Sequence, residues 1–293
     1  MIDKQSLIKW LRGADEIFEA LEERGKAYNL CRKWVEEWFC YGKFCITDDN
    51  KKFLEKFKLP IFNKEVKSRI KKDLANFLKK EIKNNTNKIA FAFSLYLISW
   101  NIRRFESYFE KNSNFNFKNF FSCLNEVFDE KFLKDLKELR EYHLLKDEIK
   151  RDLVKNIYKK LHYKLKEIGT GSQNEPIATI KIMHILAPFY IPLLDNPIAN
   201  ALEKEKVCEI FSKYETQDKN GNKKIEKKID QNSLLKYMTW IKGKFSPFYD
   251  DILCLESEKN KSFLKLLDQA FYIRYSIDIK KRLEEWDNII KKL

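Results

Sequence analysis

Glycine and proline are too scarce in this chain for a protein built from β-strands. There are 7 glycines and 6 prolines among 293 residues, and an all-β fold would need more of both at its many turns. Apolar residues instead recur every three or four positions over long stretches, which is the period of a helix with one buried face. The sequence therefore predicts an all-α, multi-helical fold.

Several segments carry this period clearly. A first helix is expected to begin with Ser6 as its cap. The most amphipathic helix follows Asn63, and its apolar face consists of Val66, Ile70, Leu74, Phe77, Leu78 and Ile82. Lysines cover much of its other face, which either is simply solvated or touches phosphate. The apolar run 89–100 is shorter than the roughly 20 residues that span a bilayer, so we interpret it as a core helix that continues to about Phe109.

The polar segment 84–87 interrupts the helical pattern. We therefore expect an N-terminal helical region over residues 1–85 and a helical core over residues 86–293. Near the C-terminus, the charged stretch 215–230 contains the strong turn signal Asn220–Gly221 and is predicted to be a solvated loop. Two further helices, over 233–242 and 262–293, are expected to close the chain.

The chain carries a formal net charge of +14 and a sequence pI of about 9.2. Excess positive charge attracts polyanions, so nucleic acid is the favoured partner. A lysine-rich composition without functional meaning and an acidic lipid surface are the alternatives. Abundant charges of both signs are also compatible with a thermophilic source. No apolar leader follows Met1 and the six cysteines form no zinc-ligand pattern, so we expect a cytoplasmic protein without metal or cofactor.

The stretch 168–202 is nearly free of charge and holds the residues that could carry chemistry. Gly169, Thr170, Gly171 and Ser172 precede a predicted apolar helix over 176–186. Two glycines around one residue allow a tight turn whose exposed backbone N–H groups can bind phosphate at the start of a helix. After a proline-bounded loop, Asp195 is predicted to open a second helix over 196–202. His184 is expected to fill the core.

Part of this stretch resembles the helix-hairpin-helix of the base-excision DNA glycosylases. The resemblance covers about 35 residues and rests on Leu165-x-x-Ile168-Gly169-Thr170-Gly171, the apolar helix after it, and Ile191-Pro192-Leu193-Leu194-Asp195-x-x-Ile198-x-x-x-Leu202. In that family the corresponding aspartate heads a helix. The same helical core also resembles many uncharacterised prokaryotic proteins, which implies no activity.

The resemblance implies that Asp195 stabilises an oxocarbenium-like sugar and helps to activate water during base removal. Bifunctional members of the family carry a nucleophilic lysine two positions after the second glycine. Gln173 stands there in this chain, so the resemblance implies a monofunctional DNA N-glycosylase, a hydrolase of DNA repair. Lys181, further along the helix, would replace that lysine only if the inserted residues 172–175 reorient it.

Two functions therefore remain open. The first is a DNA-binding protein on a glycosylase-like scaffold, with Asp195 as its active carboxylate. The second is a non-enzymatic nucleic-acid-binding or protein-interaction subunit of a mobile-element or defence system. In that case Asp195 only caps its helix, and Lys181 pairs with Asp195 or with another carboxylate.

Overall fold

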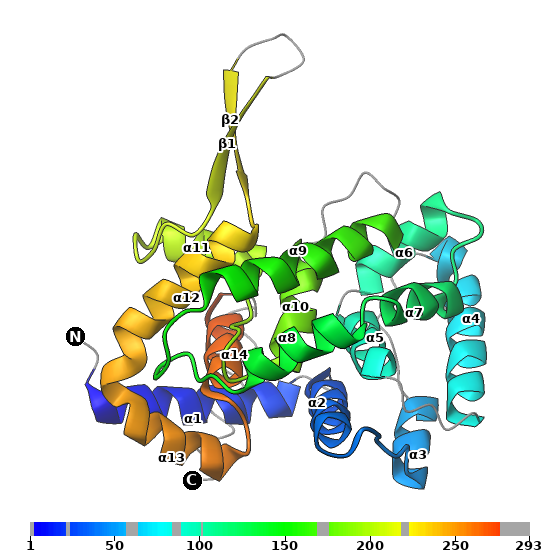
Figure 1. Ribbon diagram of the computed structural model, residues 1–293, viewed down its shortest axis with the longest axis horizontal. Coiled ribbons are helices and arrows are strands. Elements are labelled where there is room, and N and C mark those ends of the chain that lie inside the picture. Colours follow the sequence, from blue (N-terminus) through cyan, green and yellow to red (C-terminus); the bar gives the residue numbers. More distant parts are fainter. Residues whose placement is uncertain are drawn as a thin grey trace. The chain divides into compact units, whose positions relative to one another are not determined.

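Helices dominate the computed structural model of the chain (Figure 1), which confirms the all-α, multi-helical prediction. The structure describes residues 3–21, 24–56, 64–83, 89–100, 102–168, 176–217 and 223–275. Its elements are α1 (Lys4–Leu21), α2 (Arg24–Tyr41), α3 (Asp48–Lys56), α4 (Lys64–Lys83), α5 (Ile89–Trp100), α6 (Ile102–Lys111), α7 (Phe117–Asn125), α8 (Glu130–Arg140), α9 (Arg151–Ile168), α10 (Pro176–Leu186), α11 (Asn196–Lys204), β1 (Ser212–Gln217), β2 (Lys223–Lys228), α12 (Gln231–Phe245), the 3-10 helix η1 (Ser246–Phe248), α13 (Tyr249–Lys259) and α14 (Phe263–Tyr275). Among the described helices, none combines the length and apolarity that a membrane crossing requires.

The chain forms two compact units, and each is assembled from separate segments. Unit 1 comprises residues 1–23, 138–158 and 187–293, and unit 2 comprises residues 24–137 and 159–186. The predicted boundary at 84–87 lies outside the described residues. Because helices on both sides of it, α4 and α5, belong to unit 2, the compact units do not follow the division expected near residue 85.

The core of unit 2 is built around α5, which packs against α2, α6, α7 and α10. Every described side chain from Ile89 to Ser99 is buried, as expected for an apolar run without a polar face. The Tyr28 hydroxyl on α2 lies 2.9 Å from Nε2 of His184 on α10, and both side chains are buried. This hydrogen bond satisfies two polar groups inside the core and confirms that His184 is a packing residue.

A cluster of aromatic side chains from α6 and from the start of α7 forms another part of the core of unit 2. Phe115, just before α7, and Phe117, the first residue of α7, are buried against Phe105 and Phe109 of α6 with ring centroids 5.0 to 6.2 Å apart. Asn116 caps α7 by accepting a hydrogen bond from the backbone N–H of Asn119. These two phenylalanines therefore hold the start of α7 to the core of unit 2.

In unit 1, helix α14 packs against α1, α11 and α13. Lys261, just before α14, places Nζ 2.6 Å from carboxylate oxygens of both Asp15 and Glu19 on α1. Lys265 is almost fully buried, and its Nζ lies 2.8 Å from Oδ2 of Asp268. A buried ammonium is costly without a carboxylate partner. The Lys261 pairs therefore hold the start of α14 to α1, whereas the Lys265–Asp268 pair lies within α14.

The structure differs from the sequence expectations at four places. The α1 helix begins at Lys4, where Asp3 accepts a hydrogen bond from the backbone N–H of Ser6, so Ser6 is not its cap. The expected helix over 88–109 is two helices, α5 and α6. The helix α13 was not predicted. The predicted loop over 215–230 is wrong in part, because residues 212–217 and 223–228 form an antiparallel hairpin.

Replacing either of two glycines with alanine should change the free energy of unfolding, in opposite directions. Gly243 lies within α12, and a Cβ there would meet nothing within 4 Å. Gly243→Ala should raise the free energy of unfolding by about 0.5 to 1 kcal/mol, because glycine costs helix entropy. Gly42, after α2, has φ +69, so Gly42→Ala should lower stability by at least about 1 kcal/mol. Urea denaturation of both variants checks this, and the same sign for both would contradict it.

Candidate nucleic-acid interface

The β1–β2 hairpin of unit 1 has no buried face. Six residue pairs join the strands, from Ser212 opposite Lys228 to Gln217 opposite Lys223, and each of the twelve side chains is exposed or half-buried. Figure 1 shows the hairpin extending away from α11 and α12. Such a ribbon contributes little to a core, and an isolated two-stranded hairpin is only marginally stable in water. It must therefore be held by contacts at its base.

Asp230 supplies the first of these contacts. Its Oδ1 accepts hydrogen bonds from the backbone N–H groups of Asn232 and Ser233, both at 2.9 Å, which caps the start of α12. The Ser212 hydroxyl of β1 donates to the same oxygen at 2.7 Å, and the Tyr214 hydroxyl donates to Oδ2. One carboxylate thus joins the hairpin to the helix that follows it.

The charge of Asp230 is stabilised by these donors. Partial burial alone would raise the pKa of the Asp230 carboxyl, but the hydrogen bonds from Tyr214, the Ser233 backbone and Ser212 outweigh it. The net effect is a pKa below the ordinary value of 3.8. Asp230 is therefore ionised at neutral pH and holds its donors through charge-assisted hydrogen bonds.

Glu203, near the end of α11, supplies a second contact. Its Oε1 accepts a hydrogen bond from the backbone N–H of Phe211 at 2.9 Å, and its Oε2 lies 2.7 Å from Nζ of Lys227 on β2. Burial raises the pKa of Glu203, but the hydrogen bonds from Lys227 and Phe211 bring the pKa below its ordinary value. The base of the hairpin is therefore fixed to α11 as well as to α12.

The rest of the hairpin surface is basic. The two strands carry five lysines and two glutamates: Lys213, Lys223, Lys224, Lys227 and Lys228, with Glu215 and Glu226. Outside the Glu203 contact, the ion pairs of these lysines are exposed ones, such as Lys223 with Glu215 at 3.6 Å. Exposed pairs contribute at most about 1 kcal/mol. Tyr214 and Ile225 add exposed apolar area, with 42% and 65% of their surface accessible.

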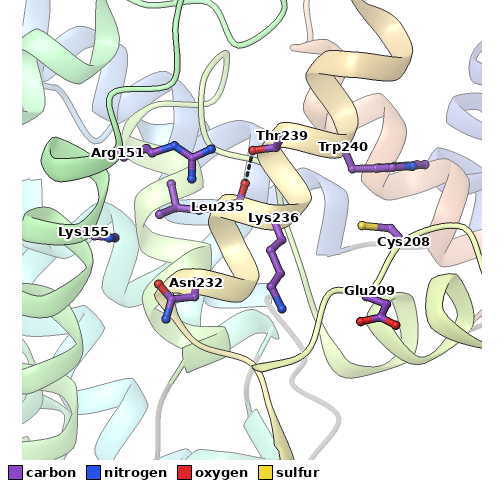
Figure 2. Close-up of a pocket in the computed structure, with 9 residues that line it drawn as sticks. All are labelled: Arg151, Lys155, Cys208, Glu209, Asn232, Leu235, Lys236, Thr239 and Trp240. Atoms are coloured by element: carbon purple, nitrogen blue, oxygen red, sulfur yellow. Dashed lines mark hydrogen bonds between the residues drawn. The ribbon is translucent and has the colours of Figure 1, made fainter. Parts of the chain in front are cut away.

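An open pocket of about 640 Å³ lies beside the start of α12, next to the base of the hairpin. Figure 2 shows Arg151 and Lys155 of α9 on one side of α12, and Cys208 and Glu209 on the other. α12 itself contributes Lys236 and two further polar side chains, together with the buried Leu235 and the half-buried Trp240. Three cations and one carboxylate therefore line the pocket.

Asp195 lies at the start of α11, as predicted from the sequence. Its carboxylate accepts a hydrogen bond from the backbone N–H of Ile198 at 3.0 Å, which confirms that it caps this helix. The side chain is half-buried. Burial and then the charges of Asp268 and Asp195 raise the pKa of the fully buried Tyr237. Asp195 therefore belongs to a group of polar side chains in unit 1.

Of the other residues predicted to act, the structure describes only Lys181. Gly169, Thr170, Gly171 and Ser172 lie outside the described residues. Lys181 is half-buried on α10, in unit 2, whereas Asp195 is in unit 1. The predicted helix before the proline-bounded loop is confirmed as α10, with the expected ends Pro176 and Leu186.

Neither the hairpin nor the pocket was predicted from the sequence. One signal for the pocket was present, because Arg151 begins α9, where the positive end of a helix disfavours a cation. In the parts that the structure describes, histidine, cysteine and acidic side chains form no cluster able to hold a metal ion.

Asp230→Ala should lower the free energy of unfolding by about 1 to 2 kcal/mol, because it removes a helix cap. Amide hydrogen exchange in β1 and β2 should accelerate with it. Since the pKa of Asp230 is lowered by folding, its contribution is complete above the unfolded-state pKa and is lost as pH falls through the folded-state pKa. The stability difference between wild type and variant should therefore shrink below about pH 4. Unchanged exchange in both strands would contradict the anchoring role.

No protein-family model, curated protein sequence or solved structure matches the chain. The resemblance to the DNA glycosylases thus stays a prediction from the residues that carry it.

Proposed function

We propose that this chain binds duplex DNA through the β1–β2 hairpin and the surface at its base. The observation that carries the proposal is a solvated ribbon with five lysines and no buried residue, anchored by Asp230 and Glu203. Because the ribbon buries no side chain, packing of the core does not explain why Asp230 and Glu203 anchor it. Contact with a polyanion supplies a reason and agrees with the net charge of +14.

The shape of the ribbon favours DNA over RNA. The major groove of B-form DNA, about 12 Å wide, admits a two-stranded β-ribbon. The major groove of A-form RNA is too deep and narrow to admit one. The exposed lysine pairs of the hairpin are weak, so the lysines can exchange their glutamate partners for phosphates at small cost. Tyr214 pairs with Glu226 and Ile225 pairs with Glu215, so Tyr214 and Ile225 lie on opposite faces of the ribbon and only one of them would face base edges.

Base removal is the second candidate function, and two features of Asp195 favour it. Asp195 heads α11, as the aspartate of the glycosylases heads a helix. It also keeps part of its surface accessible, while its charge acts on the buried Tyr237. A carboxylate in this position could stabilise positive charge that develops on a sugar. If the protein only binds DNA, Asp195 needs no role beyond capping α11.

The binding proposal predicts a strong dependence on salt. The affinity for a duplex of about 20 base pairs should fall linearly with salt on a log–log plot. Replacing Lys223, Lys224 and Lys228 with glutamine should weaken binding and make the slope less steep by up to about 2.7, which is roughly 0.9 for each phosphate that a lysine no longer neutralises. Fluorescence anisotropy at four salt concentrations measures both quantities, and duplex RNA of the same sequence should bind more weakly.

Helix α4 provides a matched control with the same change in charge. Lys71, Lys72 and Lys79 are exposed on α4 in unit 2, and replacing them with glutamine should leave the slope close to that of the wild type. Equal losses of affinity in the two triple variants would indicate a diffuse effect of net charge. A loss confined to the α4 variant would place the DNA on the lysine face of α4 and overturn the proposal.

Asp195→Asn separates catalysis from capping. Asparagine caps helices about as well as aspartate, so the variant should unfold at nearly the wild-type temperature. If Asp195 acts in base removal, the variant should lose activity on at least one duplex carrying uracil, hypoxanthine, or an alkylated, oxidised or mismatched base. Base release measured for both proteins tests this. Equal activity, or no activity of the wild type on any of these duplexes, removes the enzymatic function and leaves the binding function standing.

A further inference from the structure

The charges around the α12 pocket are poorly balanced. Arg151, Lys155 and Lys236 line it together with one carboxylate, that of Glu209, and Glu209 already lies 3.4 Å from Nζ of Lys213. Lys236 donates to the carbonyl oxygen of Phe211 at 3.1 Å. Within the described part of the chain, no carboxylate lies within ion-pair distance of any of the three cations that line the pocket. Like charges that share a pocket repel one another, so an anion there would stabilise the arrangement.

Arg151 occupies a position that helix stability does not favour. It is the first residue of the 18-residue helix α9, where the helix dipole is positive. A cation in the first turn costs roughly 0.3 to 1 kcal/mol relative to a neutral residue. Figure 2 shows the Arg151 side chain extending toward α12 and Thr239. A residue that costs stability and points into a pocket is better explained by a ligand than by the fold.

The rest of the pocket suits a molecule with an apolar part. Leu235 is a buried residue of its lining, and Trp240 forms part of its wall. The Trp240 Nε1 atom is buried and has no hydrogen-bond partner. Asn232 and Thr239 are exposed on α12 and add side-chain donors and acceptors. A volume of about 640 Å³ lies within the range of small-molecule sites, roughly 300 to 1,000 Å³.

We propose that this pocket binds the phosphate monoester of a nucleotide, with Arg151, Lys155 and Lys236 around the phosphate and Leu235 and Trp240 beside the nucleoside. A monoester carries nearly two negative charges at neutral pH, whereas each phosphate within a strand carries one, so three cations favour the monoester. The source is either the 5′-phosphate at a strand end, which rests on the proposed DNA binding, or a free mononucleotide.

The test compares ligands that differ in the monoester alone. A duplex of about 12 base pairs with a 5′-phosphate should bind at least about tenfold more tightly than its 5′-hydroxyl counterpart, the effect of charge-assisted hydrogen bonds to a phosphate. A 5′-hydroxyl duplex longer by one base pair controls for added backbone charge. Adenosine 5′-monophosphate, measured by titration calorimetry, tests the free-nucleotide source.

Variants assign the binding to the pocket. Arg151→Gln and Lys155→Gln should each remove most of the preference for the phosphate, while Lys244→Gln, an exposed lysine of α12 outside the pocket, should not. Arg151→Gln should leave the melting temperature unchanged or raise it, because the helix dipole no longer opposes a cation. Loss of binding in that variant therefore does not report unfolding.

The outcomes separate the two sources and the two proposals. Preference for the 5′-phosphorylated duplex supports the strand end, and tight binding of adenosine 5′-monophosphate without that preference supports the free nucleotide. If neither ligand shows binding that depends on Arg151 and Lys155, the inference is overturned, even where the hairpin lysines still govern salt-dependent DNA binding. Conversely, mononucleotide binding in a chain that ignores duplex DNA would refute the proposed function while the pocket assignment stands.

Discussion

The hydrogen bonds accepted by the Asp230 carboxylate are the interactions on which the arrangement of β1 and α12 in unit 1 depends. The carboxylate caps α12 and accepts hydrogen bonds from the hydroxyl groups of Ser212 and Tyr214 on β1. The buried Tyr158 of α9 is also affected: burial raises its pKa most, and the charges of Asp230 and Tyr214 raise it further. Together with the contacts of Glu203 to Phe211 and Lys227, the Asp230 carboxylate keeps the solvated hairpin attached to the helices. Because the same carboxylate orders the start of α12, it holds the lysine ribbon and the basic pocket next to each other.

Where a signal is local, the sequence predicted the structure closely. Helix α10 begins at Pro176, whose fixed φ suits the first turn of a helix, and Asp195 caps α11 as expected. Competition between neighbouring caps was less predictable. Both Asp3 and Ser6 are good capping residues, and only the structure shows that Asp3 accepts the hydrogen bond and α1 begins earlier.

The hairpin was missed for a physical reason. Strands are recognised by alternation of apolar and polar residues, which arises when one face is buried. Neither face of this hairpin is buried, so its strands resemble a charged loop, and Asn220–Gly221 was the only indication of a turn. The pocket could not be predicted because Lys236 is far in the sequence from Arg151 and Lys155, and only folding brings α9 and α12 together. Asp195 begins its helix whether it acts in base removal or only caps α11, so an activity measurement is needed to distinguish these two roles.

The central claim is that unit 1 binds DNA with its hairpin and the adjoining start of α12. Hydrogen exchange of the full chain, with and without a saturating DNA duplex and followed by mass spectrometry, tests this most directly. We expect slower exchange in residues 212–217 and 223–228 and in the first turns of α9 and α12, with little change in α4. Slower exchange confined to α4 or to other helices of unit 2, or no change anywhere under conditions that saturate binding, would contradict the account.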